Sequence, residues 1–222
     1  MLISDEIQKI TAENSVIMDV TPGEYASMKY PRLIPLMRFS VRQFLCHFGN
    51  LALMDTNALG GRMLLSTAVF TPDTGMDLPV LLIDGMKMKN KCLMYVEYYD
   101  CTKGGARLPS AETQKDEFSY LADYPEKDAW YIKRRMPCSL IKGGENASEE
   151  KLREMAVSCV RRYLDAAENS GTHPENFGGL RTFQEQMWTL GNPSVGTMTK
   201  VLGKDGAERF FKAVIMPCER VR

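Results

Sequence analysis

The chain has 222 residues, of which 44% are hydrophobic and 25% charged, and its 28 basic residues balance its 28 acidic residues. A chain of this length and composition can bury a large core as one globular domain. The balanced charge excludes a general attraction to nucleic acid or to an anionic membrane, and no apolar stretch approaches the roughly 18 to 20 residues that span a bilayer.

Several classes of cofactor site are absent from the sequence. Two histidines, His47 and His173, are too few for a multi-histidine metal site or a histidine-dependent triad. The six cysteines form no C-x-x-C pair, and the glycine pairs form neither a dinucleotide-binding fingerprint nor a P-loop. The N-terminus has early acidic residues and lacks a secretion signal. We therefore expect no metal, no bound organic cofactor and a cytoplasmic location.

The first third of the chain changes from helical to extended patterns. Residues 3–13 predict a short helix with Ser4 as a candidate cap, and residues 15–34 predict an irregular or partly extended segment. From residue 36, apolar side chains recur with a period of two, which predicts strands. The predicted strands are Leu36–Ser40, Leu51–Asp55, Met63–Phe70, Val80–Met88 and Cys92–Tyr99. Most links between them are too short for the crossover helix that parallel pairing needs, so residues 36–99 should form an antiparallel meander.

Helices dominate the C-terminal part. Residues 101–147 give weak signals: a helix over 112–121 and edge strands over 130–132 and 138–141. Within 148–217, apolar residues recur at helical spacing. The predicted helices there are 148–169, 174–190, 194–202 and 207–216. A central antiparallel sheet covered by helices gives an α+β fold, a three-layer α/β/α sandwich formed by one domain over residues 1–222.

Two acids stand out on the predicted strands. Asp84 follows four consecutive aliphatic residues, and Asp55 shares a strand face with Leu51 and Leu53. Burial of an ionised carboxylate without partners is costly, so such an acid lies in water at a strand end or has a function. The sequence does not determine which face each strand turns to the core.

The stretch from Ala68 to Asp84 carries Phe70 and Pro72, then Asp77-Leu78-Pro79, and Asp84 at the strand end. With these residues it resembles the ferredoxin-dependent bilin reductase family. The C-terminus resembles the family's last two helices, with the residues 200–203 (KVLG) and 208–211 (ERFF) after a break at 191–193. Together these parts cover about two-thirds of the chain, namely the sheet and the C-terminal helices.

This resemblance implies redox chemistry without a bound organic cofactor. The family reduces linear tetrapyrroles such as biliverdin, a product of haem catabolism, by a radical pathway of single-electron steps from ferredoxin or flavodoxin. Protons come from side chains in a pocket between the sheet and the C-terminal helices. A carboxyl group in such an apolar pocket has a raised pKa and can carry a proton near neutral pH.

The family's site residues transfer incompletely to this chain. Asp84 matches the central pocket aspartate, and Asp55 matches a pocket glutamate of phycocyanobilin-forming members. Thr67 stands where those members have histidine and others asparagine. Asn192 lies near an aspartate of the C-terminal loop, and Lys142 near an arginine that contacts a substrate propionate. The resemblance thus predicts Asp84 and Asp55 as catalytic residues and Thr67, Asn192 and Lys142 as substrate-binding residues. Met86 is added as a substrate-binding residue because strand alternation places it on the same face as Asp84.

The departures at Thr67 and Asn192 leave other functions open. One is reduction of a chlorophyll-derived linear tetrapyrrole, and another is a non-catalytic protein that binds haem or a bilin. The residues also have structural interpretations: Asp55 begins a turn-forming triplet, and Asn192 precedes Pro193 at a helix break.

Overall fold

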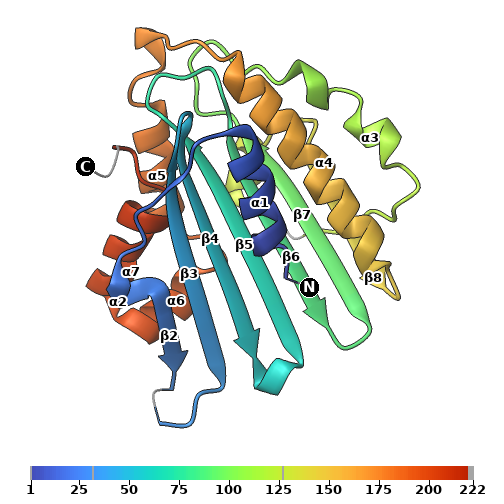
Figure 1. The fold of residues 1–222 in the computed structure, drawn as a ribbon, viewed down its shortest axis with the longest axis vertical. Coiled ribbons are helices and arrows are strands. Elements are labelled where there is room, and N and C mark those ends of the chain that lie inside the picture. The colour runs from blue at the N-terminus through green and yellow to red at the C-terminus, as the bar shows by residue number, and fades with distance from the viewer. Residues whose placement is uncertain (1, 32, 127, 220–222) are drawn as a thin grey trace.

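An antiparallel sheet occupies the middle of the molecule. The computed structural model describes residues 2–31, 33–126 and 128–219. Within them the strand order is β1-β3-β4-β5-β6-β7-β8, with β2 also paired to β3 (Figure 1). The strands are β1 (Met18–Asp19), β2 (Ser27–Tyr30), β3 (Met37–Cys46), β4 (Gly49–Ala58), β5 (Met63–Pro72), β6 (Val80–Met88), β7 (Lys91–Tyr99) and β8 (Leu140–Glu145). Neighbours in sequence from β3 to β7 are neighbours in space, which confirms the antiparallel meander.

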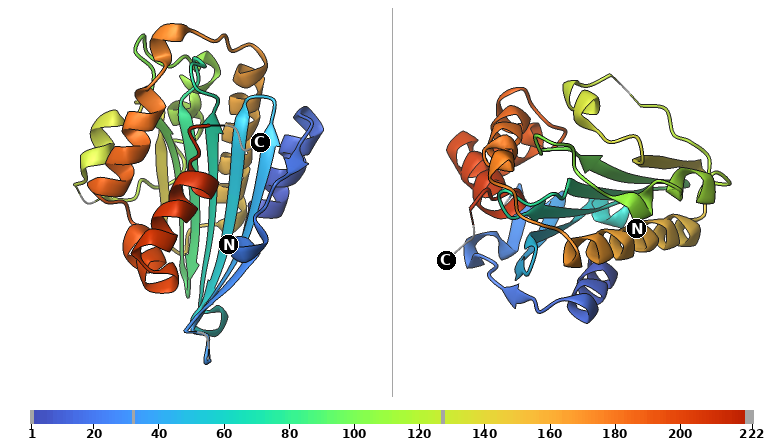
Figure 2. Two further views of the ribbon diagram at one scale, coloured as in Figure 1. Left: turned by 90° about the vertical axis from the view of Figure 1, so that its left-hand side faces the viewer. Right: turned by 90° about the horizontal axis from the view of Figure 1, so that it is seen from above.

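Helices cover both faces of this sheet. Helices α1 (Ser4–Asn14) and α4 (Glu149–Glu168) lie on one face. The other face carries α5 (Gly179–Thr189), α6 (Val195–Leu202), α7 (Lys204–Phe210) and the π-helix η5 (Phe211–Ile215). Seen from above, the sheet lies between these two groups of helices (Figure 2). The predicted three-layer α/β/α architecture is therefore confirmed.

The remaining helical elements are short. They are α2 (Gly23–Ala26), α3 (Gln114–Glu117), η1 (Leu59–Gly61), η2 (Pro109–Ala111), η3 (Trp130–Arg134) and η4 (Pro174–Asn176). Among the described residues, no helix is long and apolar enough to cross a membrane.

Among the predicted strands, β3 extends furthest beyond its predicted end. This strand continues past Ser40 to Cys46 and turns at once into β4. Arg42 and Gln43 interrupt its apolar alternation, but both find partners: Arg42 pairs with Asp5, and the Gln43 amide donates to the Asn50 side chain at 2.8 Å. The turn requires glycine at residue 49, where φ is 140° and a Cβ atom would lie 2.3 Å from a backbone oxygen.

Predictions outside the meander were less accurate. Residues 130–132 form part of the 3₁₀-helix η3 rather than an edge strand, and the last strand begins at Leu140. The helix expected over 112–121 is only the short α3. Ser4 does not cap α1, because its hydroxyl donates to Asp55 instead. By contrast, Ser148 caps α4 as predicted, since its Oγ accepts from the Lys151 backbone N–H.

Both faces of the sheet are buried, so hydrophobic core residues lie on each side of it. Phe48, Phe70 and Tyr163 pack as an aromatic cluster between the sheet and α4, with ring centroids 5.3 to 5.9 Å apart. On the other face, Phe183 of α5 packs on Tyr99, and Phe210 belongs to a separate cluster with strand residues. The face beneath the C-terminal helices is where the candidate site lies.

Candidate functional site

A small apolar pocket lies between the sheet and the C-terminal helices, and we call it the Asp84 pocket. Its volume is about 70 Å³. Strands β4, β5 and β6 supply Met54, Thr67, Val69, Leu82 and Asp84. The C-terminal segment supplies residues that include Met187, Trp188, Asn192, Met198, Phe210, Phe211, Ile215 and Met216. An apolar lining around one acidic group is the usual composition of a ligand or catalytic site.

Strand register brings the polar side chains of the pocket together. Asp84 pairs directly with Thr67 on β5 and with Tyr95 on β7. Side chains of directly paired residues stand on the same face of an antiparallel sheet. The Thr67 hydroxyl donates to Asp84 Oδ1 at 2.5 Å.

Two opposing effects act on the Asp84 carboxyl group. Burial raises its pKa because desolvation disfavours the charged form, and the hydrogen bond from Thr67 lowers it by stabilising the carboxylate. Desolvation is the larger effect, so the pKa of Asp84 lies above its ordinary value. Asp84 is only partly buried by accessible surface, so a molecule in the pocket can reach it. A raised pKa together with partial exposure suits a group that exchanges a proton with a bound molecule.

The helical wall of the pocket depends on buried amide side chains. In the π-helix η5 and the residues beside it, backbone carbonyls accept from side chains of other elements. Gln43 donates to Ala213 O and Asn50 to Val214 O, while Gln184 donates to Lys212 O and Met216 O. A π-helix is an uncommon element that often occurs at functional sites. Here it positions Phe211 and Ile215 against the pocket.

The structure separates Asp55 from Asp84. Asp55 pairs with Ser66, which in turn pairs with Gly85, one residue after Asp84. Side chains alternate between faces along a strand, so Asp55 lies on the opposite face, beneath α1. There its Oδ1 accepts from the hydroxyls of Ser4 and Ser66 at 2.7 and 2.6 Å. The expectation that both acids share one pocket is corrected by this one-residue difference in register.

The predicted substrate-binding residues are also divided between the two faces. Lys142 lies on the Asp55 face, where it contacts Asp123 at 2.7 Å and donates to Leu121 O. Met86 stands on the Asp84 face but does not line the pocket. Asn192 does line it, although its amide is used within its own turn, donating to Met187 O and accepting from the Ser194 N–H. Asp84, Thr67 and Asn192 are thus the predicted residues that the structure brings together.

Glu97 is an acidic residue of this face that sequence reasoning missed. It pairs with Leu82, two residues from Asp84, and is 6% exposed. Its Oε1 accepts from the Tyr99 hydroxyl at 2.8 Å and from Arg135 Nη1 at 3.0 Å. Burial is the main cause that raises the pKa of Glu97 to about 7. Its position in the predicted strand Cys92–Tyr99, between apolar and aromatic residues, was the available signal.

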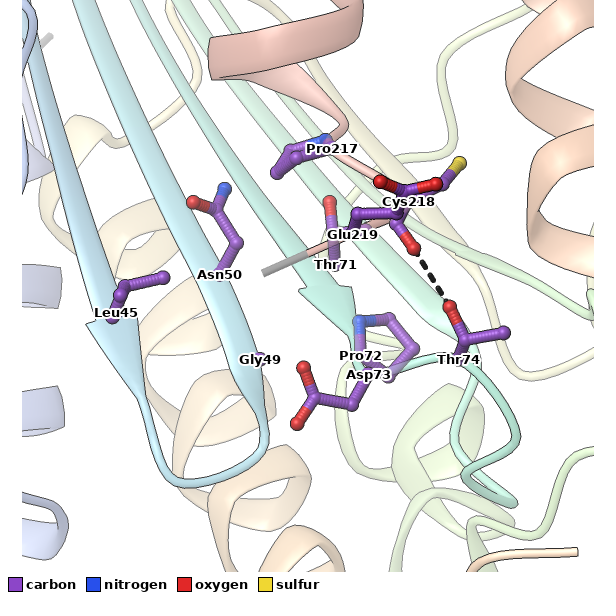
Figure 3. A pocket seen from close by; sticks show the side chains of 10 residues that line it. All are labelled: Leu45, Gly49, Asn50, Thr71, Pro72, Asp73, Thr74, Pro217, Cys218 and Glu219. Carbon is purple, nitrogen blue, oxygen red and sulfur yellow. Dashed lines mark hydrogen bonds between the residues drawn. The ribbon is translucent and has the colours of Figure 1, made fainter. Parts of the chain in front are cut away.

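The larger hollows have a different composition. One of them, about 790 Å³, lies where β3, β4 and β5 meet the C-terminal segment (Figure 3). Thr74 donates there to the Cys218 carbonyl oxygen at 2.7 Å. Its described lining includes the carboxylates of Asp73 and Glu219 and no basic side chain, so it does not suit an anionic ligand. In the described parts of the chain, no three His, Cys, Asp or Glu side chains gather as a metal site.

Comparisons with known proteins show a likeness in fold. No protein-family model matches this chain. No curated protein sequence matches it either. Among solved structures, it is similar to phytochromobilin synthase from tomato in complex with biliverdin, with a TM-score of 0.72 and 10% sequence identity. The likeness covers 93% of this chain and 79% of the tomato chain. At this identity the match establishes a shared fold.

Proposed function

We propose that this protein reduces a linear tetrapyrrole such as biliverdin, with Asp84 as its principal proton donor. The observation that carries the proposal is the Asp84 carboxyl group, whose pKa is raised by burial, in an apolar pocket between the sheet and the C-terminal helices. A protein of the same fold, tomato phytochromobilin synthase, has been crystallised with biliverdin. The sequence motifs around Asp84 resemble the ferredoxin-dependent bilin reductase family to which that enzyme belongs.

The chemistry requires electrons and protons from separate sources. Reduction of one carbon–carbon double bond adds two electrons and two protons to the pigment. A one-electron donor such as ferredoxin or flavodoxin supplies the electrons, and the added negative charge makes the pigment more basic. Asp84 then gives up its O–H proton to the pigment and is left as a carboxylate. Thr67 holds this carboxylate through its hydroxyl.

The pocket lining supports a flat conjugated ligand. Trp188 and Phe211 stack with ring centroids 6.2 Å apart, and both line the pocket beside Met187 and Met198. Aromatic faces and methionine side chains contact extended π-systems favourably. The binding energy would come from this apolar wall, and Asp84 would direct the proton.

An anaerobic absorbance titration tests the proposal. Biliverdin is added first, and reduced ferredoxin follows. We expect a shifted spectrum on binding and its conversion to a new band on reduction. The Asp84→Asn variant should bind biliverdin with similar affinity and lose about 10²-fold or more in turnover. Asp205→Asn, which changes an exposed acid on α7, is the control and should behave as wild type.

The same titration separates the alternative functions. A bound spectrum that does not respond to ferredoxin would indicate a carrier, which the absence of histidine at Thr67 and of an acid at Asn192 also favours. Turnover of a chlorophyll-derived linear tetrapyrrole, with none of biliverdin, would reassign the substrate. No spectral change on addition of either pigment would contradict a tetrapyrrole function.

A further inference from the structure

We propose that Glu97 is the proton reserve of the Asp84 pocket: it holds a second proton and returns it to the Asp84 carboxylate after Asp84 has protonated the pigment. The inference rests on the proposed function for its chemical role, and on the structure for the pairing of the two acids. In the transfer, the O–H bond of Glu97 breaks and an O–H bond forms on Asp84. No electrons move in this step.

The first argument is position. Asp84 lies opposite Tyr95, and Glu97 is two residues further along β7. Glu97 is therefore the diagonal neighbour of Asp84 on the same face, and such neighbours are about 7 Å apart in a regular antiparallel sheet. The charge of Asp84 is one of the causes that raise the pKa of Glu97. One water molecule or a side-chain rotation can bridge a separation of this size.

The second argument is that Glu97 can carry a proton despite its contact with Arg135. Both hydrogen bonds to Glu97, from Tyr99 and Arg135, reach Oε1. Its Oε2 accepts no hydrogen bond from a described residue and so remains available for a proton. Arg135 also donates to both carboxylate oxygens of Glu126 at 2.8 Å, and this divides its positive charge between two acids.

The third argument is a route to solvent. Arg135 and Glu126 both line a surface hollow of about 550 Å³ on the side of β8. The side chains of Glu97 and Arg135 are 8% and 9% exposed, whereas that of Glu126 is 28% exposed. The contacts Glu97–Arg135–Glu126 thus lead from the pocket face to the surface. Arg135 keeps its own proton, so a water molecule that recharges Glu97 must pass from the hollow beside the Arg135 guanidinium.

Other groups around Glu97 also influence its charge. Tyr95, Tyr99 and Asp84 face it from the sheet, and Tyr131, Arg135 and Glu126 face it from the segment before β8. Burial raises the pKa of each of these three tyrosines, so they stay neutral near pH 7. Burial raises the pKa of Glu97 to about 7 and also raises the pKa of Asp84, and as neighbouring acids the two should titrate as a coupled pair.

Infrared spectroscopy without pigment tests the pairing. The C=O band of protonated carboxyl groups is followed as the pH is raised. We expect one component to disappear near pH 7 in wild type and in the control Asp205→Asn, and to be missing in Glu97→Gln. In Asp84→Asn, which leaves Glu97 intact, this component should disappear at lower pH because a neighbouring negative charge is lost. A component unchanged in both Glu97→Gln and Asp84→Asn would overturn the pairing.

Single-turnover reduction of biliverdin tests the chemical role. Glu97→Gln should leave binding and the first protonation unchanged and slow the second protonation about 10²-fold. Glu97→Asp, which keeps a carboxyl group, should restore part of this rate. Equal rates for both protonations in Glu97→Gln would overturn the reserve. Coupled infrared bands in a protein that reduces no tetrapyrrole would instead refute the proposed function and with it the reserve role.

Discussion

Asp84 shows how two neighbouring contacts set the availability of one proton. Desolvation by the apolar pocket raises the pKa of the carboxyl group, and the Thr67 hydroxyl partly opposes this effect. Thr67 cannot itself act as an acid near neutral pH. We therefore interpret it as a residue that tunes and orients Asp84.

Removal of the Thr67 hydroxyl should shift the pH dependence of reduction. Thr67→Val keeps the shape of the side chain and deletes the hydrogen bond that lowers the pKa of Asp84. The pKa then rises further, so Asp84 stays protonated to higher pH. We expect the basic limb of the kcat profile to move to higher pH. Thr67→Ser retains the hydroxyl and is the control; a Thr67→Val limb at the wild-type pH would contradict the tuning role.

At the scale of elements, Asp55 connects a helix to the sheet. It accepts hydrogen bonds from Ser4 in the first turn of α1 and from Ser66 on β5, and it lies 3.6 Å from Arg42 Nη2. The Ile3 backbone N–H also donates to Ser66. These contacts fix the start of α1 on the sheet face that is remote from the Asp84 pocket.

Substitution of Asp55 should therefore affect stability and spare turnover. Asp55→Ala removes two hydrogen bonds to a charged group and should lower the free energy of unfolding by about 2 kcal/mol. The rate of pigment reduction per folded molecule should be unchanged. Chemical denaturation and turnover assays check the two results. Asp5→Ala, which removes a 93% exposed acid from the same Arg42, should change stability by less than about 1 kcal/mol.

The hydrogen bonds from Gln184 to the region of the π-helix lead to a prediction about the stability of the pocket wall. Gln184→Leu removes the donor to Lys212 O and Met216 O and leaves two carbonyls without that partner. We expect a loss of about 1 to 3 kcal/mol in stability and weaker biliverdin binding, because Phe211 and Met216 lose their fixed positions. Unfolding curves and the absorbance titration measure both effects.

A matched control lies on the same helix. Gln186 Oε1 is buried and has no hydrogen-bond partner among the described residues. Gln186→Leu removes this unsatisfied oxygen, so stability should stay the same or increase. If Gln184→Leu and Gln186→Leu gave equal unfolding curves and equal affinities, the amide contacts would not support the pocket wall.

At the scale of the whole molecule, the pocket must enlarge to admit a pigment. Its volume of about 70 Å³ is well below the several hundred Å³ of pockets that hold drug-sized ligands. We expect helix α6 to be the part of the pocket wall that moves, because Met198 is the one buried residue of this helix. Gly191 and Gly203, with φ of 92° and 74°, flank this helix and supply backbone conformations that other residues rarely adopt.

Hydrogen exchange should detect this enlargement. Amides of α6 and α7 should exchange faster than those of α4, which is packed along its length on the opposite face. Addition of biliverdin should slow exchange in α6 and α7 and leave α4 unchanged, because the pigment fills the space between these helices and the sheet. Equal protection of α6 with and without pigment would contradict this mode of entry.

Much of the architecture could be predicted from local sequence signals. The period-two runs and the short links were sufficient for β4 to β7 and for their antiparallel order, since neither depends on distant residues. The apolar stripe and the Ser148 cap were sufficient for α4. Local signals did not predict the end of β3 or the form of residues 130–134, because polar side chains there are satisfied by residues far along the chain.

The composition of the site depended on tertiary structure. Asp84, Thr67 and Asn192 were identified from the sequence and lie around one pocket. The position of Asp55 could not be predicted, because both faces of β4 are buried and Leu51 to Met54 are apolar on either side. Only the pairing register assigns Asp55 to α1 and Glu97 to the Asp84 face. The sequence therefore determined which acids lie in the sheet, and the three-dimensional pairing of strands decided which of them can act together.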